Sequence, residues 1–343
     1  MPRLGTVAVV AGAALLARRA MRRRIQASPL WPMPALEEPV SGRPRTRALR
    51  LTVSSYEPVA EGVVRLRLAG RDLPHLPRWE PGAHLDLVLP SGLVRQYSLC
   101  GDPADSSSYT VAARLVEDGR GGSREVHERV REGVELQVRG PRNRFPLVEA
   151  SSYVFVAGGI GITPILPMLR ALPDGTEWRL LYCGRTRDSM PFLDEVEKLG
   201  ERRVTVVAGR PDLGVFLADV PEGAAVYCCG PQGLMDAVEE RCPAVHLERF
   251  TPRAATGSAF EVELRRSGRT LTVAADSSVL AAVREALPDT AYSCEQGFCG
   301  TCQQRVLEGQ IEHRDELLTD AERADSMLIC VSRARGERIV LDM

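Results

Sequence analysis

The stretch Tyr292-Ser293-Cys294-Glu295-Gln296-Gly297-Phe298-Cys299-Gly300-Thr301-Cys302 decides how this sequence is interpreted. Its three cysteines have the spacing C-x4-C-x2-C, and a fourth cysteine, Cys330, follows after a longer gap. This spacing is typical of a [2Fe–2S] cluster, in which four thiolates hold two irons. Gly297 and Gly300 would allow backbone N–H groups to approach the sulfurs, because a Cβ at either position would obstruct them.

Two other uses of four cysteines compete with this interpretation: a disulfide pair and a four-cysteine zinc site. Zinc ribbons usually pair two C-x-x-C arms, and only one such arm, Cys299 to Cys302, is present. We therefore predict that Cys294, Cys299, Cys302 and Cys330 ligate an iron–sulfur cluster. The other five cysteines are scattered and lie mostly in apolar runs, which favours a reducing, cytoplasmic compartment. They are Cys100, Cys183, Cys228, Cys229 and Cys242.

The length of 343 residues predicts two or three domains. A hydrophobic content of 44% and a charged content of 26% are ordinary for globular proteins. The net charge of −1 argues against a general nucleic-acid-binding protein. This near-neutral total conceals an asymmetry, because residues 1–50 carry a net charge of about +8 and the remainder about −9.

The N-terminal segment is the most ambiguous part of the chain. Residues 4–17 form a short apolar run, and five arginines follow within residues 18–24. The run is shorter than the roughly 17–25 residues of an ordinary membrane-spanning helix, and charge after the run does not fit a signal peptide. Two interpretations stay open for residues 1–25: a leader without structure, or a short tether through residues 4–24 on the cytoplasmic face of a membrane. Residues 26–47 are rich in proline and predict an extended linker.

The first folded domain is expected over residues 48–147. Alternating apolar and polar residues predict strands at 63–68, 85–89, 109–116 and 134–138. Gly and Pro residues separate these short strands, so we expect an antiparallel β-barrel.

Two motifs in this domain suit a mononucleotide phosphate. Arg95, Tyr97 and Ser98 combine a guanidinium that can fork onto phosphate oxygens with an aromatic face that can cover a flat ring. Alone, this would be an ordinary edge-strand pattern. The stretch Gly119-Arg120-Gly121-Gly122-Ser123 leads into a helix expected at 124–130, and such a turn offers N–H groups to an anion. Together, the two motifs predict the two halves of one site.

The second domain is expected over residues 148–250 and begins with a buried strand at 153–157. That strand enters Gly158-Gly159-Ile160-Gly161-Ile162-Thr163-Pro164, and an apolar helix follows to about residue 172. The glycines would let the backbone approach a pyrophosphate, and proline suits the first helical turn. The motif is not G-x-G-x-x-G, so a purely structural strand–turn–helix is the alternative.

These motifs resemble the phthalate dioxygenase reductase and vanillate demethylase reductase group of the ferredoxin–NADP reductase superfamily. The resemblance is carried by RQYSL at 95–99, GRGGS at 119–123, PRNRFPL at 141–147, GGIGITP at 158–164 and CGPQGLM at 229–235. It covers about residues 48–343. It implies an antiparallel β-barrel flavin domain, an α/β parallel-sheet nicotinamide domain and a β-grasp [2Fe–2S] ferredoxin domain over 258–343.

The resemblance also implies roles for individual residues. In the barrel, Arg95 would bind the phosphate of FMN, which the group uses rather than FAD, while Tyr97 would pack on the isoalloxazine and Ser98 would approach its reactive nitrogen. In the nicotinamide domain, Thr163 would contact the nicotinamide region, and Cys229 would lie close to the nicotinamide ring. Ser98, Thr163 and Cys229 are thus the predicted catalytic residues. The remaining predicted cofactor-binding residues are Gly121, Gly122, Ser123, Gly158, Gly159, Gly161, Arg185, Gly230 and Pro231.

The choice of nicotinamide cofactor has opposing signals. A strand expected at 178–183 opens onto Gly184-Arg185-Thr186-Arg187, where an arginine can accept a ribose 2′-phosphate and an acid would accept a free 2′-OH. Arg185 and Arg187 therefore raise NADPH as a candidate, whereas the resemblance favours NADH. Phe250, near the end of this domain, would cover part of the flavin by resemblance or would be a plain core aromatic.

The third domain has one surface feature of interest. A hairpin at 259–264 and 270–273, a helix at 277–287 and strands at 303–307 and 338–341 fit the β-grasp pattern that the resemblance implies. Six acidic residues lie within 312–325, and they are either a solvated face or a docking patch for a basic electron acceptor. They are Glu312, Asp315, Glu316, Asp320, Glu322 and Asp325.

The three domains predict one electron-transfer chain. NADH or NADPH delivers two electrons as a hydride, a cluster accepts one at a time, and a flavin can take two electrons and release them singly. We predict the reductase component of an oxygenase system, whose separate partner is a Rieske-type oxygenase or a cytochrome P450. Two alternatives stay open: a redox sensor or electron-carrier module without NADH turnover, and a ferric or quinone reductase without a protein acceptor.

Overall fold

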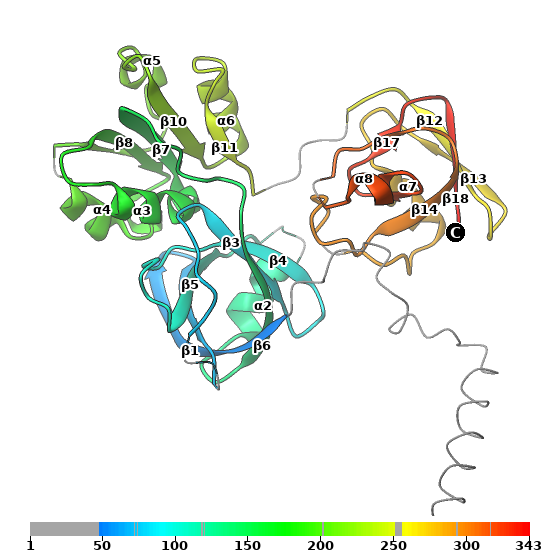
Figure 1. Ribbon diagram of the computed structural model, residues 1–343, viewed down its shortest axis with the longest axis horizontal. Helices are drawn as coiled ribbons and strands as arrows, with labels where there is room; N and C mark the ends of the chain where they lie inside the picture. The colour runs from blue at the N-terminus through cyan, green and yellow to red at the C-terminus, as the bar shows by residue number, and fades with distance from the viewer. Residues whose placement is uncertain are drawn as a thin grey trace, which may run out of the picture. The chain divides into compact units, whose positions relative to one another are not determined.

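The computed structural model describes residues 48–71, 73, 75–117, 119, 121–200, 202–250, 256–292, 294–315 and 317–343 (Figure 1). The predicted tether (1–25) and linker (26–47) lie outside the described residues, so both stay predictions. Within the described ranges, no helix has the length and apolarity required to span a membrane.

The first sheet has six antiparallel strands in the order β4-β3-β6-β1-β2-β5. The strands are β1 (Leu49–Ala60), β2 (Val63–Ala69), β3 (Ala83–Val88), β4 (Val94–Ser98), β5 (Ser108–Arg114) and β6 (Glu135–Asn143). A bridge between Leu99 and Val111 joins the ends of the order, so the sheet closes into the expected barrel. Helix α2 (Gly122–Arg129) lies between β5 and β6 in the chain.

Alternation along the strands explains the barrel. In β2, Leu66 and Leu68 are fully buried, whereas the alternating residues Arg65 and Arg67 keep solvent contact. In β3, Leu85 and Leu87 point into the same core. Period-two burial of this kind is what an antiparallel sheet around one apolar core requires. The strand β1 was not predicted, although its alternating Leu49, Leu51 and Val53 carry the same signal.

The second sheet has five parallel strands in the order β11-β10-β7-β8-β9. They are β7 (Ser152–Gly158), β8 (Glu177–Gly184), β9 (Val204–Ala208), β10 (Ala224–Cys229) and β11 (His246–Glu248). Two apolar cores lie on the two faces of this sheet: one includes α3 (Ile162–Ala171) and α4 (Leu193–Leu199), and the other includes α5 (Leu213–Phe216) and α6 (Gln232–Glu239) (Figure 1).

The strand order reverses direction at β7, because the chain proceeds to β8 on one side while β10 lies on the other. In an open parallel sheet, ligands bind at the carboxyl ends of the strands next to such a switch point. The turns after β7 and β10 are the two glycine-containing motifs at 158–164 and 229–235. The topology therefore brings both predicted nicotinamide motifs to the ligand-binding edge.

The third sheet is mixed, in the order β13-β12-β18-β14-β16. Its strands are β12 (Phe260–Leu264), β13 (Arg269–Val273), β14 (Gln303–Glu308), β16 (Ser326–Leu328) and β18 (Arg338–Leu341), and α7 (Val279–Ala286) packs against its core. Strands β12 and β18 pair in parallel and the other neighbours are antiparallel. A mixed sheet with one packed helix is the predicted β-grasp fold, so the predicted fold class is confirmed for all three sheets.

Several short elements of the third unit were not predicted. Strands β15 (Ile311–Glu312) and β17 (Arg333–Ala334) form a separate pair, and α8 (Asp320–Arg323) is a single turn. Such short segments have no periodicity to detect. The predicted helix at 277–287 is correct within two residues, and the hydroxyl of Ser278 accepts the N–H of Ala281 as an N-cap.

One buried arginine connects several loops within residues 256–343. Arg333, at 2% exposure, donates hydrogen bonds to the carbonyl oxygens of Ser258 (3.0 Å), Ala274 (2.9 Å) and Ser277. Its guanidinium also lies over the ring of Phe260, 5.0 Å from the centroid. These carbonyls belong to loops that no strand pairing satisfies, so one side chain replaces several backbone partners.

We expect the substitution Arg333→Met to lower the free energy of unfolding of residues 256–343 by about 1.5 to 3 kcal/mol, because the hydrogen bonds of a charged donor to three carbonyl oxygens are lost. Urea unfolding followed by circular dichroism measures this loss. The matched control is Arg335→Met, two residues away at an exposed position. Equal stability of the two variants would contradict the role given to Arg333.

Candidate functional site

The cysteine loop brings its thiols together. Cys294, Cys302 and Cys330 are buried, and Cys299 is partly exposed. The thiol of Cys294 is within hydrogen-bonding reach of Cys299 and Cys330, and that of Cys302 is within reach of Cys330. Cys294 also accepts the backbone N–H of Gln296 at 3.3 Å. These contacts place the four thiols in one connected group, as a shared cluster requires.

The thiols are close in pairs rather than gathered around a single point. Among the described residues, no three His, Cys, Asp or Glu side chains are arranged to hold a single metal ion. A [2Fe–2S] cluster takes two thiolates on each of two irons. The four predicted cysteines therefore fit a two-iron cluster by their chemistry and by their neighbouring thiols.

The glycines of this loop are also required by its backbone geometry, beside the predicted approach of N–H groups to the sulfurs, which stays a prediction for Gly297 and Gly300. Gly297 and Gly300 adopt positive φ angles of 78° and 77°, which only glycine adopts without strain. An added Cβ at Gly297 would lie 2.8 Å from a methyl of Val331 and 3.2 Å from the Cα of Asp315, and one at Gly300 would lie 2.8 Å from a methyl of Leu317. The glycines are thus needed for the turn and for close packing against neighbouring segments.

The flavin motif lies on β4, next to β3. Arg95, Tyr97 and Ser98 pair with Leu87, Leu85 and His84. Arg95 and Tyr97 lie on one face of the strand, and Ser98 lies on the other, because side chains alternate along a strand. Burial raises the pKa of the Tyr97 phenol, so this ring remains neutral at physiological pH.

The structure places the two predicted halves of the phosphate site side by side. Helix α2 begins at Gly122, and its N-cap is Gly121 at a φ of 79°. An added Cβ at Gly122 would lie 2.3 Å from the Nε of Arg95. The first helical turn, with its free N–H groups, therefore lies against the guanidinium. A cation beside a helix N-terminus is an arrangement that suits a phosphate.

The side chain of Ser123 is partly occupied by its own loop. Its hydroxyl accepts the N–H of Val116 at 3.1 Å. The same hydroxyl donates to the carbonyl oxygen of Val116 at 3.5 Å. The two contacts stabilise the turn between β5 and α2, and they occupy the hydroxyl hydrogen that a phosphate would accept.

The two nicotinamide motifs are in close contact. An added Cβ at Gly161 would lie 2.1 Å from the carbonyl oxygen of Cys229, and one at Gly158 would lie 2.6 Å from the ring of Pro231. An added Cβ at Gly230 would lie 3.0 Å from the backbone of Gly158. Gly159 adopts a φ of 53° in the same turn. These contacts let two turns approach at backbone distance, which is also what a pyrophosphate would need.

Thr163 and Cys229 are both buried next to these turns. Thr163, at 2% exposure, donates its hydroxyl hydrogen to the carbonyl of Ile160 at 2.9 Å. Cys229 is fully buried at the end of β10, and burial raises its pKa well above the ordinary value. Its sulfur is therefore a neutral thiol at physiological pH.

Glu248 is a site residue that the sequence analysis missed. It ends β11, in register with Cys229 on β10. The hydroxyl of Ser98 donates to its Oε2 at 3.0 Å. The residue keeps some accessible surface, but its carboxyl group is densely surrounded by protein atoms, and this burial raises its pKa to about 8. Its position at the carboxyl end of a parallel strand was the available signal.

The structure thus brings Ser98, Cys229 and Glu248 together from two sheets. Ser98 comes from the barrel, and the other two come from adjacent parallel strands. The Glu248 carboxylate also raises the pKa of Cys229, which places the two groups within electrostatic range. Phe250, two residues beyond Glu248, is 37% exposed, so it is not a plain core aromatic.

The arginines after β8 differ in their surroundings. Arg185 is exposed at the end of the strand. Arg187 forms an ion pair with Glu197, at 2.7 Å between Nη2 and Oε1. A guanidinium paired in this way has less capacity for a 2′-phosphate, which weakens the part of the NADPH argument that used Arg187.

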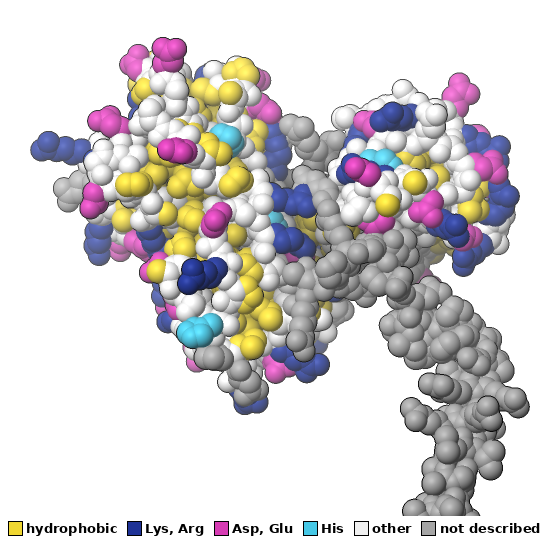
Figure 2. Space-filling model, viewed as in Figure 1, with side chains coloured by type: hydrophobic (Ala, Val, Ile, Leu, Met, Phe, Trp, Pro, Cys, Tyr) yellow, Lys and Arg dark blue, Asp and Glu magenta, His cyan; other side chains and the backbone are white. Residues whose placement is uncertain are grey.

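The acidic segment 312–325 is not a continuous charged face. Asp315 and Glu322 are buried, and Glu312 forms an ion pair with Arg314 at 2.9 Å. Glu322 closes a capping box with Thr319 at the start of α8. On the face of residues 256–343 visible in Figure 2, acidic and basic side chains are interspersed. The docking-patch interpretation therefore loses three of its six charges, whereas Asp320 stays exposed and Glu316 lies outside the described residues.

Comparisons with known proteins identify the family of the chain. The family described as the 2Fe-2S iron-sulfur cluster binding domain matches residues 262–335. The chain is 39% identical over 315 residues to the phthalate 4,5-dioxygenase oxygenase reductase subunit of Pseudomonas putida, covering 85% of this chain and 96% of that protein.

Two solved structures are similar over most of the chain. Phthalate dioxygenase reductase has a TM-score of 0.63 at 36% identity and covers 87% of this chain and 98% of its own. An intact type IV self-sufficient cytochrome P450 monooxygenase has a TM-score of 0.67 at 38% identity and covers 92% of this chain but 44% of its own. The chain belongs to the phthalate dioxygenase reductase family, the flavin- and [2Fe–2S]-containing reductase subunits of oxygenase systems.

Proposed function

We propose that this reductase takes a hydride from NADH onto FMN held by Arg95 and α2, and passes single electrons through the cluster held by Cys294, Cys299, Cys302 and Cys330. A separate Rieske oxygenase or cytochrome P450 receives the electrons. The observation that carries the proposal is the hydrogen bond from Ser98 to Glu248, because it joins the end of the flavin strand to the last strand of the nicotinamide sheet.

The phosphate end of the flavin is the part that the barrel residues would hold. Arg95 supplies the positive charge, and the N–H groups at the start of α2 supply directional donors. The flavin, when bound, supplies the conversion of a two-electron transfer into two single-electron transfers. The residues around it fix its orientation and do not take part in covalent chemistry.

The nicotinamide end depends on small and neutral groups. Gly158, Gly161 and Gly230 leave room for a backbone-level approach. Cys229 contributes a neutral and polarizable surface, because its raised pKa keeps the thiol protonated. Thr163 is held by Ile160, so the start of α3 is rigid at this edge. Placement of this kind is how a protein accelerates hydride transfer between two bound groups.

Glu248 sets the charge of the site. Its pKa of about 8 means that the carboxyl group is protonated and neutral at pH 7. The sign follows from the raised pKa: the neutral form predominates below about pH 8, and the carboxylate forms as the pH rises through that value. A hydride passed between two bound groups would leave the total charge of the site unchanged and would add negative charge on the flavin side, where Ser98 contacts Glu248. A neutral Glu248 would favour this shift of charge, and an ionised Glu248 would oppose it.

Electrons would leave the protein from the cluster. Cys299 is the one cysteine of the four that keeps partial exposure, so the protein surface is nearest on its side. The relatives named above are reductase components of oxygenases, and one solved neighbour is a cytochrome P450 monooxygenase whose chain includes a region similar to this protein. Both facts support an oxygenase as the electron acceptor. The ion pair of Arg187 supports NADH over NADPH.

The phosphate assignment predicts that Arg95→Ala weakens FMN binding by about tenfold to a hundredfold, because a charge-assisted hydrogen bond is lost. Quenching of FMN fluorescence on titration with flavin-free protein measures the dissociation constant. The control is Arg50→Ala in the same barrel, whose ion pair with Glu135 lies at the surface. Unchanged affinity in Arg95→Ala would refute the assignment.

The charge of Glu248 predicts a pH effect. In the unmodified protein at saturating NADH, the single-turnover rate of flavin bleaching should fall as the pH rises through about 8. A decrease of about tenfold corresponds to roughly 1.4 kcal/mol of charge repulsion. The substitution Glu248→Gln keeps an acceptor for Ser98 and should abolish the pH step. Stopped-flow spectroscopy measures the rate of flavin bleaching at each pH. If the decrease near pH 8 persists in Glu248→Gln, another group causes it.

The electron path predicts a separable defect in Cys302→Ser. Flavin bleaching by NADH under anaerobic conditions should continue, while NADH-dependent reduction of cytochrome c should fall to the background rate, because the cluster loses a ligand. The control is Cys242→Ser, at a partly exposed cysteine of the nicotinamide domain. Full cytochrome c reduction by Cys302→Ser would exclude the cluster as the exit.

A further inference from the structure

The segment that follows β15 lies directly against the cysteine loop. The Cα of Asp315 would be 3.2 Å from a Cβ at Gly297, and a methyl of Leu317 would be 2.8 Å from one at Gly300. The main chain at Asp315 and the side chain of Leu317 therefore leave no room for a side chain at Gly297 or Gly300. Any displacement of residues 315–318 would therefore leave the loop that carries Cys294, Cys299 and Cys302 without support.

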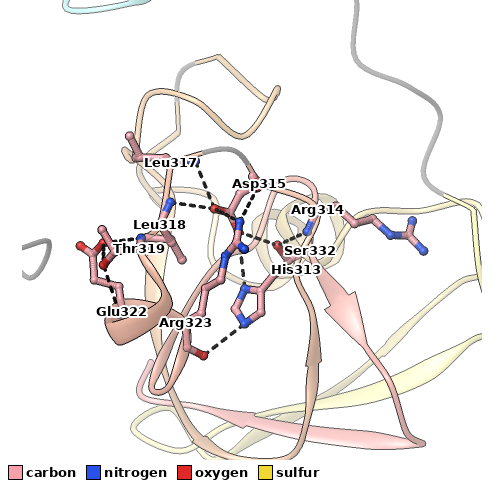
Figure 3. A network of polar contacts seen from close by, with 9 residues as sticks. All are labelled: His313, Arg314, Asp315, Leu317, Leu318, Thr319, Glu322, Arg323 and Ser332. Carbon is pink, nitrogen blue, oxygen red and sulfur yellow. Dashed lines mark hydrogen bonds and ion pairs between the residues drawn. The ribbon is translucent and has the colours of Figure 1, made fainter. Parts of the chain in front are cut away.

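The carboxylate of Asp315 organises this segment. Its side chain has 0% exposure. Oδ2 accepts the backbone N–H of Leu317 at 3.2 Å and that of Leu318 at 2.8 Å. Figure 3 shows both N–H groups pointing at the carboxylate from the turn that leads into α8. Asp315 thus fixes the backbone on which Leu317 is presented to Gly300.

The other carboxylate oxygen contacts the segment of the fourth cysteine. Ser332, two residues after Cys330, donates its hydroxyl to Oδ1 at 3.4 Å, and the N–H of Arg314 donates to the same hydroxyl at 3.3 Å. One carboxylate therefore connects the support under the first three cysteines with the chain that carries the fourth (Figure 3).

Arg323 and His313 lie next to the buried carboxylate. The Nη2 of Arg323 lies 3.7 Å from Oδ2, and the Nδ1 of His313 lies 3.5 Å from Oδ1. Arg323 also donates to the carbonyl of Asp315 at 2.9 Å, and a ring nitrogen of His313 lies 3.1 Å from the carbonyl of Arg323. A buried carboxylate is costly unless it is paired and hydrogen-bonded. The full set of partners indicates that this charge is kept for a positional purpose.

We propose that Asp315 is a positioning residue of the iron–sulfur cluster. It is not a ligand. It acts through Leu317 and Gly300 on one side and through Ser332 on the other, and it holds the loop of three cysteines and Cys330 at the separation that a two-iron cluster needs. The proposal rests on the cluster assigned under the proposed function.

The test compares two substitutions that each remove one negative charge from the same segment. Asp315→Asn removes the buried charge and part of its acceptor capacity. Asp320→Asn, the matched control, removes an exposed charge at the start of α8. Both are measured in the full chain loaded with its cluster. The first readout is the half-life of the visible cluster absorbance in excess EDTA, and the second is the electron paramagnetic resonance spectrum after reduction.

We expect the cluster of Asp315→Asn to be lost about tenfold faster than that of the unmodified protein, because hydrogen bonds to a charged group are lost. Its resonance lines should be broadened by heterogeneous cluster geometry. Asp320→Asn should match the unmodified protein in both readouts. Ser332→Ala, a milder change, should shift both in the same direction as Asp315→Asn, and it supplies the test if Asp315→Asn does not load a cluster.

Two outcomes would overturn the inference. If Asp315→Asn and Ser332→Ala both behave like Asp320→Asn, the network does not position the cluster. If the loss of Asp315 accelerates cluster release only in proportion to a lowered melting temperature of the whole unit, with an unchanged resonance spectrum, its role is general stability. Failure of the unmodified protein to take up any [2Fe–2S] cluster would refute the proposed function itself, and this result is distinguishable from both.

Discussion

The hydrogen bond from Ser98 to Glu248 joins the two folds of the reductase half at the predicted flavin and nicotinamide motifs, whereas the bonds from Arg170 to the carbonyls of Cys100 and Gly101 join them elsewhere. It joins a barrel to a parallel sheet, two folds that have no strand pairing in common. Because the pKa of Glu248 is raised to about 8, the bond at pH 7 is made between two neutral groups. A bond between neutral groups adds no fixed charge between the two motifs, and its directionality still orients the Ser98 hydroxyl.

The rest of the nicotinamide edge follows from backbone proximity. The turn after β7 and the turn after β10 approach so closely that a methyl group at Gly161 would overlap the carbonyl of Cys229. Side chains are thus excluded from the place where the two strands end. The switch in strand order puts that place at the opening of the sheet, so topology and residue size together create the site.

Much of this could be predicted from the sequence, for identifiable reasons. Strands with period-two alternation predict the barrel, and a continuous apolar strand predicts the parallel sheet. The cysteine spacing alone indicates the cluster. Glu248 could not be predicted in the same way, because a lone glutamate near the end of a domain has no pattern. The acidic segment 312–325 has a clear pattern, but this pattern does not show which of its acids are exposed. Its composition suggests a solvated surface, yet Asp315 and Glu322 are buried, and only tertiary contacts decide which acids face inward.

The position of β18 has a consequence for biogenesis. In the third sheet, β18 lies between β12 and β14, although it is the last of these strands along the chain. During synthesis, Cys294, Cys299, Cys302 and Cys330 all leave the ribosome before the strand that completes their sheet. Until β18 inserts, β12 and β14 lack their shared neighbour, and the four thiols belong to an unfinished core. The sheet beneath the four cysteines is therefore complete only when β18 has joined it, so a stable cluster site depends on the last strand of the sheet.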